Sequence, residues 1–200
     1  MVYQSIPTKN QLKLLYLSKK HSSKEISKIL GFSCKKIDYW LKVYKIQKRS
    51  ISEAIYLKHN PDGDPFVLRK FKFEQKSFLY GLGLGLYWGE GNKANKNSIR
   101  LGNSNPKLIK GFMDFLEGIY GVKKEDLRFW LQIFGDIDKN IALEFWANEL
   151  SVPKSQFMTP VVSKLRGNGT YRNKSQHGVL TVCFHTTKLR NIICGAIDKL

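Results

Sequence analysis

The run FLYGLGLGLYWGEGN, residues 78–92, limits what this chain can fold into more than any other stretch. It is apolar, it is rich in glycine, and it ends beside one carboxylate, Glu90. A nucleotide-binding GxGxxG loop is excluded, because that spacing places Leu86 or Trp88 where the third glycine must stand. A membrane span is also excluded, because the run is shorter than the roughly 20 apolar residues that a bilayer requires.

A helix over residues 74–90 explains the glycines, because Gly81, Gly85 and Gly89 then share one face. Each glycine costs roughly 1 kcal/mol relative to alanine inside a helix. We therefore expect another backbone to approach this face closely, and a twofold axis makes the same helix of a second subunit the natural partner. The other faces are expected to be buried through Leu79, Leu82, Leu86 and Tyr87.

The charge of the chain points to a polyanionic partner. Lys and Arg outnumber Asp and Glu by 34 to 16, a formal net charge of +18. Nucleic acid is the default partner of such a field, and a membrane surface would need an amphipathic helix or a lipidation motif that the sequence does not display. The N-terminus lacks the order of a signal peptide, and Cys34, Cys183 and Cys194 match no zinc spacing. We expect a cytoplasmic, nucleoid-associated protein that is not secreted and has no small-molecule cofactor.

Composition and turn signals divide the chain into three segments. Residues 1–50 contain 12 Lys or Arg against two acids, and residues 51–73 form a linker around the turn cluster NPDGDP, where Asp62 and Asp64 are expected to be turn residues. Residues 74–200 follow an α+β pattern. Its expected elements are a helix at 74–90, a strand at 98–104, a helix at 105–121, a strand at 126–135, a helix at 138–150, strands at 159–165 and 178–186, and a helix at 187–200. Its expected core aromatic residues are Phe129, Trp130, Phe145 and Trp146.

The segment SSKEISKILGFSCKKIDYWLK, residues 22–42, follows a helix-turn-helix pattern. Ser22 and Glu25 can form a capping box, Gly31 suits the turn, and Ile37 and Trp40 can anchor the second helix. The alternative is a helical hairpin with a solvated basic face. The segment resembles the small helix-turn-helix domains of transposases and resolvases.

In a helix-turn-helix the second helix enters the major groove of DNA. The residues expected to face the bases are Ser33, Cys34, Lys35, Asp38, Tyr39 and Lys42. Nearby lysines are expected to bind phosphates, which set affinity rather than sequence preference; these are Lys24, Lys28, Lys36 and Lys45.

The stretch GLYWGEG, residues 85–91, resembles the second part of the LAGLIDADG motif of homing endonucleases. Gly85 matches the internal glycine, Leu86 the second leucine, Glu90 the metal-binding acid and Gly91 the final glycine. Two positions depart from the motif, since Gly83 replaces the first leucine and Trp88 stands where an acid is frequent. The order of elements from 74 to 200 is also similar to the αββαββα core of that family, with an additional helix at 138–150.

The resemblance implies a homodimer with an antiparallel, saddle-shaped sheet along the major groove of double-stranded DNA. The two motif helices would pack through Gly81, Gly85 and Gly89, and Glu90 with the backbone of Gly91 would hold Mg²⁺ or Mn²⁺ for cleavage of both strands. Lys164 would be the basic catalytic residue near the scissile phosphate. A transcriptional regulator that binds without cutting and an RNA-binding maturase are the alternatives on the same scaffold.

Several further residues are candidates for DNA contacts. Lys93, Lys96 and Arg100 lie on or before the first strand, and Gln132 on the next strand can read an adenine edge. The basic loop at 164–178 is expected to grip phosphates, with a solvated hairpin as the alternative. Its candidate residues are Arg166, Arg172 and Lys174.

Overall fold

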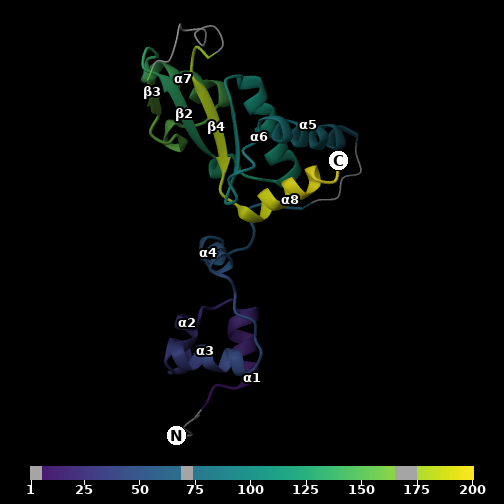
Figure 1. The fold of residues 1–200 in the computed structure, drawn as a ribbon, viewed down its shortest axis with the longest axis vertical. Coiled ribbons are helices and arrows are strands. Elements are labelled where there is room, and N and C mark those ends of the chain that lie inside the picture. Colours follow the sequence, from purple (N-terminus) through teal and green to yellow (C-terminus); the bar gives the residue numbers. More distant parts are fainter. Residues whose placement is uncertain (1–5, 69–73, 165–174) are drawn as a thin grey trace. The chain divides into compact units, whose positions relative to one another are not determined.

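The computed structural model describes residues 6–68, 74–164 and 175–200. The chain divides into two compact units, residues 1–64 and residues 65–200, each with its own hydrophobic core (Figure 1). The division falls inside the segment 51–73 that the sequence indicates as a linker. The α+β class expected for the chain is confirmed.

The N-terminal unit is helical. Its elements are α1 (Lys9–Leu12), the π-helical segment η1 (Lys13–Ser18), α2 (Ser23–Leu30), α3 (Cys34–Val43) and α4 (Ile51–His59). The predicted capping box is confirmed, because the Ser22 hydroxyl accepts from the Glu25 amide and the Glu25 carboxylate accepts from the Ser22 amide. Gly31 ends α2 with a φ of 70°, a conformation that suits glycine. The fully buried core residues are Leu12, Ile26, Ile37 and Leu41.

The C-terminal unit combines helices with one four-stranded sheet. Its helical elements are α5 (Glu74–Glu90), α6 (Pro106–Tyr120), η2 (Lys124–Asp126), α7 (Lys139–Leu150), η3 (Lys154–Gln156) and α8 (Thr187–Ile197). Its strands are β1 (Ile99–Asn103), β2 (Arg128–Phe134), β3 (Val161–Ser163) and β4 (Val179–Phe184), in the spatial order β1-β4-β2-β3.

The sheet is mixed, so the prediction of an antiparallel sheet is wrong at one edge. β4 pairs antiparallel with both β1 and β2, whereas β3 runs parallel to β2. The chain leaves β2, passes through α7 and η3 and returns in the same direction, which is how helical crossovers produce parallel pairs. The two strands expected around the basic loop therefore do not form a hairpin with each other. Between α5 and α6 the described residues also contain one strand rather than two, preceded only by an isolated bridge from Gly91 to Leu101.

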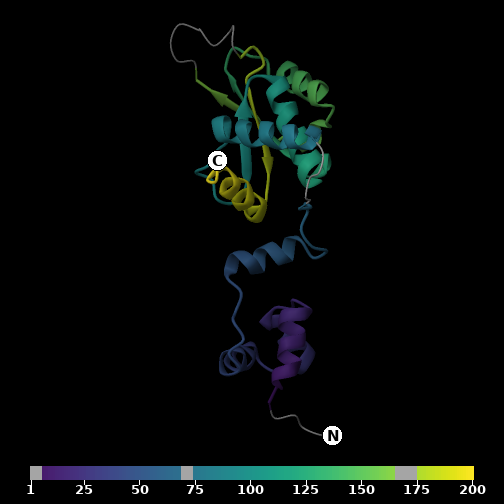
Figure 2. The ribbon, with the colours of Figure 1, turned by 90° about the vertical axis from the view of Figure 1, so that its right-hand side faces the viewer.

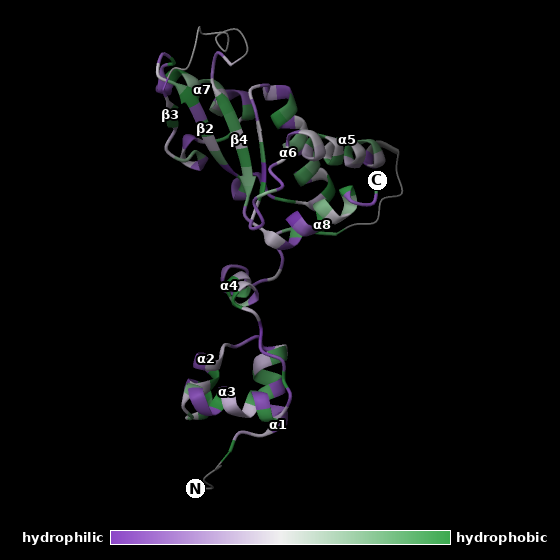
Figure 3. Cartoon of the chain, in the orientation of Figure 1, coloured by the Kyte–Doolittle hydropathy of each residue, from purple (hydrophilic) through white to green (hydrophobic). Residues whose placement is uncertain are grey.

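Helices α6 and α7 lie on one side of the sheet (Figure 2). Alternate residues of β2, namely Phe129, Leu131 and Ile133, are buried against this layer, and the alternation can be followed in Figure 3. As predicted, the helix expected at 105–121 ends at Gly121, which has a φ of 64°. The Asp138 carboxylate caps the start of α7.

Glycine has two different roles in α5. A side chain at Gly83 would overlap the ring of Phe115 on α6, so a close approach of the two helices requires glycine there. Gly81, Gly85 and Gly89 face open space instead. Leu82 is 40 % exposed, so its predicted burial is wrong; Leu84 is buried in its place.

We predict opposite stability effects for two alanine substitutions in α5. Gly83→Ala should destabilise the C-terminal unit by about 1–3 kcal/mol, because the added methyl group overlaps a buried ring. In the isolated chain, Gly81→Ala should stabilise the unit by up to about 1 kcal/mol, because the site is open there and alanine favours the helix. Native-state hydrogen exchange of the α6 amides measures both, and equal effects of the two variants would contradict the packing described here.

Candidate nucleic-acid interface

One face of the sheet is not covered by the helical layer and carries basic and aromatic side chains. Strand alternation places these residues opposite the buried ones, and the four strands contain no Asp or Glu. We call this surface the open sheet face; its main residues are Arg100, Arg128, Trp130, Gln132, Thr181 and His185. Trp130 lies here, half-buried, rather than in the core where it was expected, whereas Phe129 and Trp146 are fully buried.

Arg100, Trp130 and His185 form the centre of the open sheet face. The Arg100 guanidinium lies over the Trp130 ring, 4.3 Å from its centroid, and its Nε donates to the Ser98 hydroxyl at 2.8 Å. The His185 ring meets the edge of Trp130 with ring centroids 5.9 Å apart. These contacts fix a flat cation and two rings on one surface, the groups that stack on bases and pair with phosphates.

The pKa values of two groups near Arg100, the Cys183 thiol and the His185 ring, are shifted in the directions that favour their neutral forms. Burial lowers the pKa of His185, and the positive charges of Arg100 and Arg128 lower it further. Burial raises the pKa of the Cys183 thiol, which lies 3.5 Å from His185 Nε2. A neutral thiol is a poor nucleophile, so these shifts disfavour nucleophilic chemistry at this pair.

Arg128 and Gln132 extend the open sheet face along β2. Both side chains are exposed. Arg128 Nη1 donates to the carbonyl oxygens of Glu125 and Leu127 at 2.7 and 2.8 Å, which orients its guanidinium. Gln132 Nε2 donates to the Ser163 hydroxyl on β3 at 3.0 Å, so this proposed base reader is held by the neighbouring strand.

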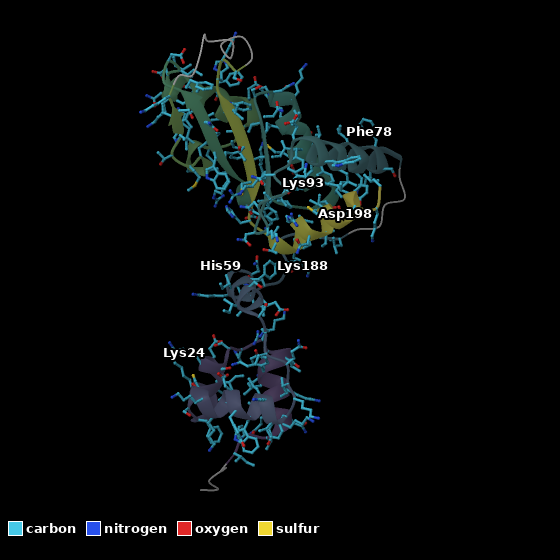
Figure 4. All side chains as sticks on the ribbon, viewed as in Figure 1. Lys24, His59, Phe78, Lys93, Lys188 and Asp198 are labelled. Atoms are coloured by element: carbon cyan, nitrogen blue, oxygen red, sulfur yellow. The ribbon has the colours of Figure 1, made fainter. Side chains whose placement is uncertain are left out.

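The segment after α5 is held by backbone contacts. Lys93 Nζ donates to the carbonyl oxygens of Trp88 and Tyr87, which places its charge at the C-terminal end of the helix (Figure 4). The Asn92 amide donates to the Arg100 carbonyl at 2.8 Å and ties the segment to β1. Lys96 is exposed. Lys93 therefore has a structural partner, in addition to its predicted role at a phosphate.

Glu90 is exposed at the end of α5, and Gly91 bridges to β1. Lys164 follows β3 at the opposite edge of the sheet, so within one chain it lies several strand spacings, about 15 Å or more, from Glu90. Within the described ranges, no group of three or more His, Cys, Asp or Glu converges as a metal site. One carboxylate and one carbonyl leave the other positions of an octahedral Mg²⁺ ion to water, to phosphate oxygens or to a second copy of the chain, so Glu90 and Gly91 alone form only a sparse magnesium site.

In the N-terminal unit, most residues proposed to read bases are exposed on α3. These are Ser33, Cys34, Lys35, Tyr39 and Lys42. Asp38 differs, because its carboxylate accepts from the Ser23 hydroxyl at 2.7 Å and pairs with Lys48 at 2.9 Å. Although burial opposes it, these contacts leave the pKa of Asp38 lowered. Asp38 therefore joins α3 to α2 rather than projecting freely.

Three proposed DNA contacts, Arg166, Arg172 and Lys174, lie outside the described residues. Conversely, sequence reasoning missed Arg128, Trp130 and His185 as surface candidates. The signal was present for Trp130, because Phe129 and Trp130 are adjacent in a strand and must point to opposite faces.

Comparisons with known proteins return no match: no family model fits the chain, and no curated protein or solved structure is significantly similar to it. Among the described residues, no helix has the length and apolar character needed to cross a membrane. The geometry above is therefore the basis for assigning a function.

We predict that His185 titrates below its ordinary pKa of about 6.5. Since the folded state binds this proton less well than the unfolded chain, His185 should reduce stability as the pH falls below about 6.5. Arg100→Gln should raise the pKa of His185 partway, and Arg128→Gln should raise it less. An NMR titration of the His185 ring measures this, and a wild-type pKa at or above 6.5 would contradict the arrangement.

Proposed function

We propose that this chain is a sequence-specific DNA-binding protein whose open sheet face lies against the duplex. The observation that carries the proposal is the cluster of Arg100, Arg128 and Trp130 on a sheet face without a single carboxylate. Such a surface attracts phosphates over its whole width, and its planar groups can contact base edges. Thr181 and Gln132 add polar groups between the charges.

The N-terminal unit supports the same function. The turn at Gly31 joins α2 to α3, and α3 presents Lys35, Tyr39 and Lys42 to solvent, as a recognition helix would. Two basic surfaces in one chain favour a long DNA site, because each unit adds its own phosphate and base contacts. RNA remains the partner in the maturase alternative, and the competition experiment below separates the two.

The order of elements favours a LAGLIDADG-like core. When α7 and β3 are set aside, the chain runs α5, β1, α6, β2, β4, α8, and β4 lies antiparallel between β1 and β2. That arrangement is compatible with the αββαββα pattern if the bridge at Gly91 stands for its first strand. Under this proposal, α7 and β3 are an insertion at one edge of the saddle.

A second copy of this chain is the proposed partner of α5. Beside the three open glycines lie three exposed apolar side chains on the same side of the helix, and we call these six residues the glycine face: Phe78, Gly81, Leu82, Gly85, Trp88 and Gly89. Phe78 is 72 % exposed and Trp88 is 58 % exposed, which is costly for large apolar groups in water (Figure 4). A twofold crossing at the glycines would bury both.

DNA cleavage is the second candidate function, and the exposure of Glu90 next to the glycine face favours it. In the proposed dimer each copy contributes one Glu90 carboxylate and one Gly91 carbonyl, and DNA phosphates would complete the oxygen ligands. Bound Mg²⁺ or Mn²⁺ would supply an activated water and neutralise the leaving oxygen. A regulator would use the same DNA contacts without this chemistry.

We predict that the double variant Arg128→Gln/Lys164→Gln weakens DNA binding and its salt dependence. If both side chains contact phosphates, the slope of log affinity against log salt should fall by about 1.8, which corresponds to two contacts. The measurement is fluorescence anisotropy with a labelled duplex taken from the locus that encodes the chain, over a range of salt concentrations. An unlabelled duplex and a hairpin RNA of equal length serve as competitors.

The matched control is Lys107→Gln/Lys139→Gln, which removes the same charge from exposed residues at the starts of α6 and α7. Its slope should stay near that of the wild type. An equal fall of the salt slope in both double variants would show that only net charge matters for binding. That result would overturn the assignment of the open sheet face. Stronger competition by RNA than by DNA would overturn the DNA proposal.

We predict that Glu90→Gln abolishes metal-dependent nicking while DNA binding and dimer formation persist, because the substitution removes only a negative charge at an exposed site. Gly85→Leu should give a folded monomer, because the site is open in the isolated chain but blocked in a crossing. Nicking of a plasmid with Mg²⁺ and with Mn²⁺, together with sedimentation velocity, measures both effects.

The outcomes separate the parts of the proposal. A wild type that binds DNA but never nicks it contradicts the nuclease and leaves the regulator. A Glu90→Gln variant that nicks at the wild-type rate contradicts the site, and a dimeric Gly85→Leu variant contradicts the interface.

A further inference from the structure

A basic cleft lies within the N-terminal unit, beside α2 and α4. Its walls are the turn before α2, the first turns of α2 and the helix α4, and it encloses about 950 Å³. We call it the α2–α4 cleft. Seven Lys and Arg side chains line it against one carboxylate, that of Glu25.

Arg49 holds the two walls of the cleft together. Its guanidinium donates to the carbonyl oxygens of Lys20 and His21 at 2.8 and 2.5 Å and lies over the Tyr16 ring at 4.3 Å from the centroid. Its backbone amide donates to the Tyr16 hydroxyl at 2.9 Å. Because Ser50 caps α4 directly after Arg49, these contacts set where α4 leaves the helical core.

The positive charges in the cleft are largely uncompensated. Glu25 is engaged by the Ser22 amide and hydroxyl at 2.7 and 2.8 Å. Of the lining lysines, Lys48 pairs with Asp38, whereas no salt bridge in the described residues involves the other five, which are all exposed: Lys19, Lys20, Lys24, Lys28 and Lys58. Like charges that line one cleft repel one another, and an anionic ligand bound between them would relieve that repulsion.

The cleft also has an apolar wall. Ile51 and Ile55 on α4 line it, and they are 81 % and 53 % exposed. A ligand that fits this lining must carry regular negative charges and apolar groups between them. A sugar–phosphate strand meets both requirements, because its phosphates alternate with deoxyribose rings.

The cleft borders the surface that α3 would present to bases. Ser23, which lines the cleft, donates its hydroxyl to Asp38, and the thiol of Cys34 lies 3.4 Å from the Ser27 hydroxyl on the same helix α2. Lys24 follows Ser23 in the sequence and also lines the cleft. A duplex whose major groove receives α3 would therefore bring a flanking backbone to the mouth of the cleft.

We propose that the α2–α4 cleft binds the sugar–phosphate backbone of double-stranded DNA beside the site of α3, with Arg49 as the positioning residue that keeps the cleft open. This rests on the proposed DNA-binding function and extends the contact of the N-terminal unit beyond the recognition helix. The helix α4, which the sequence indicates only as part of a linker, becomes one wall of a binding site.

The test uses the full chain, the labelled duplex and the salt dependence of binding. Lys24→Gln/Lys58→Gln should lower the slope by about 1.8, because each lysine releases the counterions of one phosphate. Arg49→Lys keeps the charge but cannot reproduce the forked donor geometry, so it should lower the slope as well and reduce the protection of α4 amides in hydrogen exchange. The matched control is Lys9→Gln/Lys13→Gln, which removes two charges from α1 and η1 outside the cleft and should keep the wild-type slope.

Each outcome decides a separate claim. A wild-type slope in Lys24→Gln/Lys58→Gln, or an equal fall in the control, would overturn the cleft while leaving DNA binding by the open sheet face intact. A wild-type slope in Arg49→Lys would show that the lysines act without the cleft and would also overturn the proposal. If the wild-type chain fails to bind the duplex at all, the proposed function itself is wrong.

Discussion

The approach of Gly83 to the Phe115 ring determines how the C-terminal unit is arranged. No side chain fits between α5 and α6 at this point, so glycine there lets the helices pack closely. Tyr87 then stacks on Phe112 with ring centroids 5.8 Å apart, and Leu84 is buried beside them. These contacts fix the rotation of α5 about its own axis. The same rotation turns Gly81, Gly85 and Gly89 towards solvent. The close packing at Gly83 therefore determines that these three glycines are exposed.

The distribution of charge complements this packing. The buried side of the sheet is apolar, whereas Arg100 and Arg128 lie on the open sheet face and seven Lys and Arg side chains line the α2–α4 cleft. A formal charge of +18 on 200 residues repels itself and opposes compactness. A polyanion bound to the folded state relieves this repulsion and stabilises the fold by mass action. The stacking of Arg100 on Trp130 acts locally in the same sense, because the ring stabilises a cation for which the described part of the chain shows no salt bridge.

Features set by neighbouring residues could be predicted from the sequence, and features set by distant contacts could not. The capping box at Ser22, the turns at Gly31 and Gly121 and the cap at Asp138 depend on local backbone geometry, and all are present. The parallel edge strand β3 depends on where a crossover returns, which no local pattern encodes. The exposure of Leu82 depends on the rotation of α5, which the distant residue Phe115 sets. The position of Trp130 follows from the period-two alternation of β2, which outweighs the tendency of large aromatic side chains to lie in the core.

Each chain places one carboxylate, that of Glu90, at the end of α5, and under the proposed function this ties DNA cleavage to dimer formation. Elsewhere in the described residues no group of three or more His, Cys, Asp or Glu converges, so one copy would offer a magnesium ion at this place a single carboxylate, with water and phosphate oxygens filling the other positions. A second copy brought in through the glycine face would supply a second carboxylate from the end of its own α5. The monomer would then bind DNA through its basic surfaces but leave it intact, and strand cleavage would begin only where two copies meet on one site. Apolar contact at Phe78 and Trp88, rather than any change in the acid itself, would thus control the chemistry.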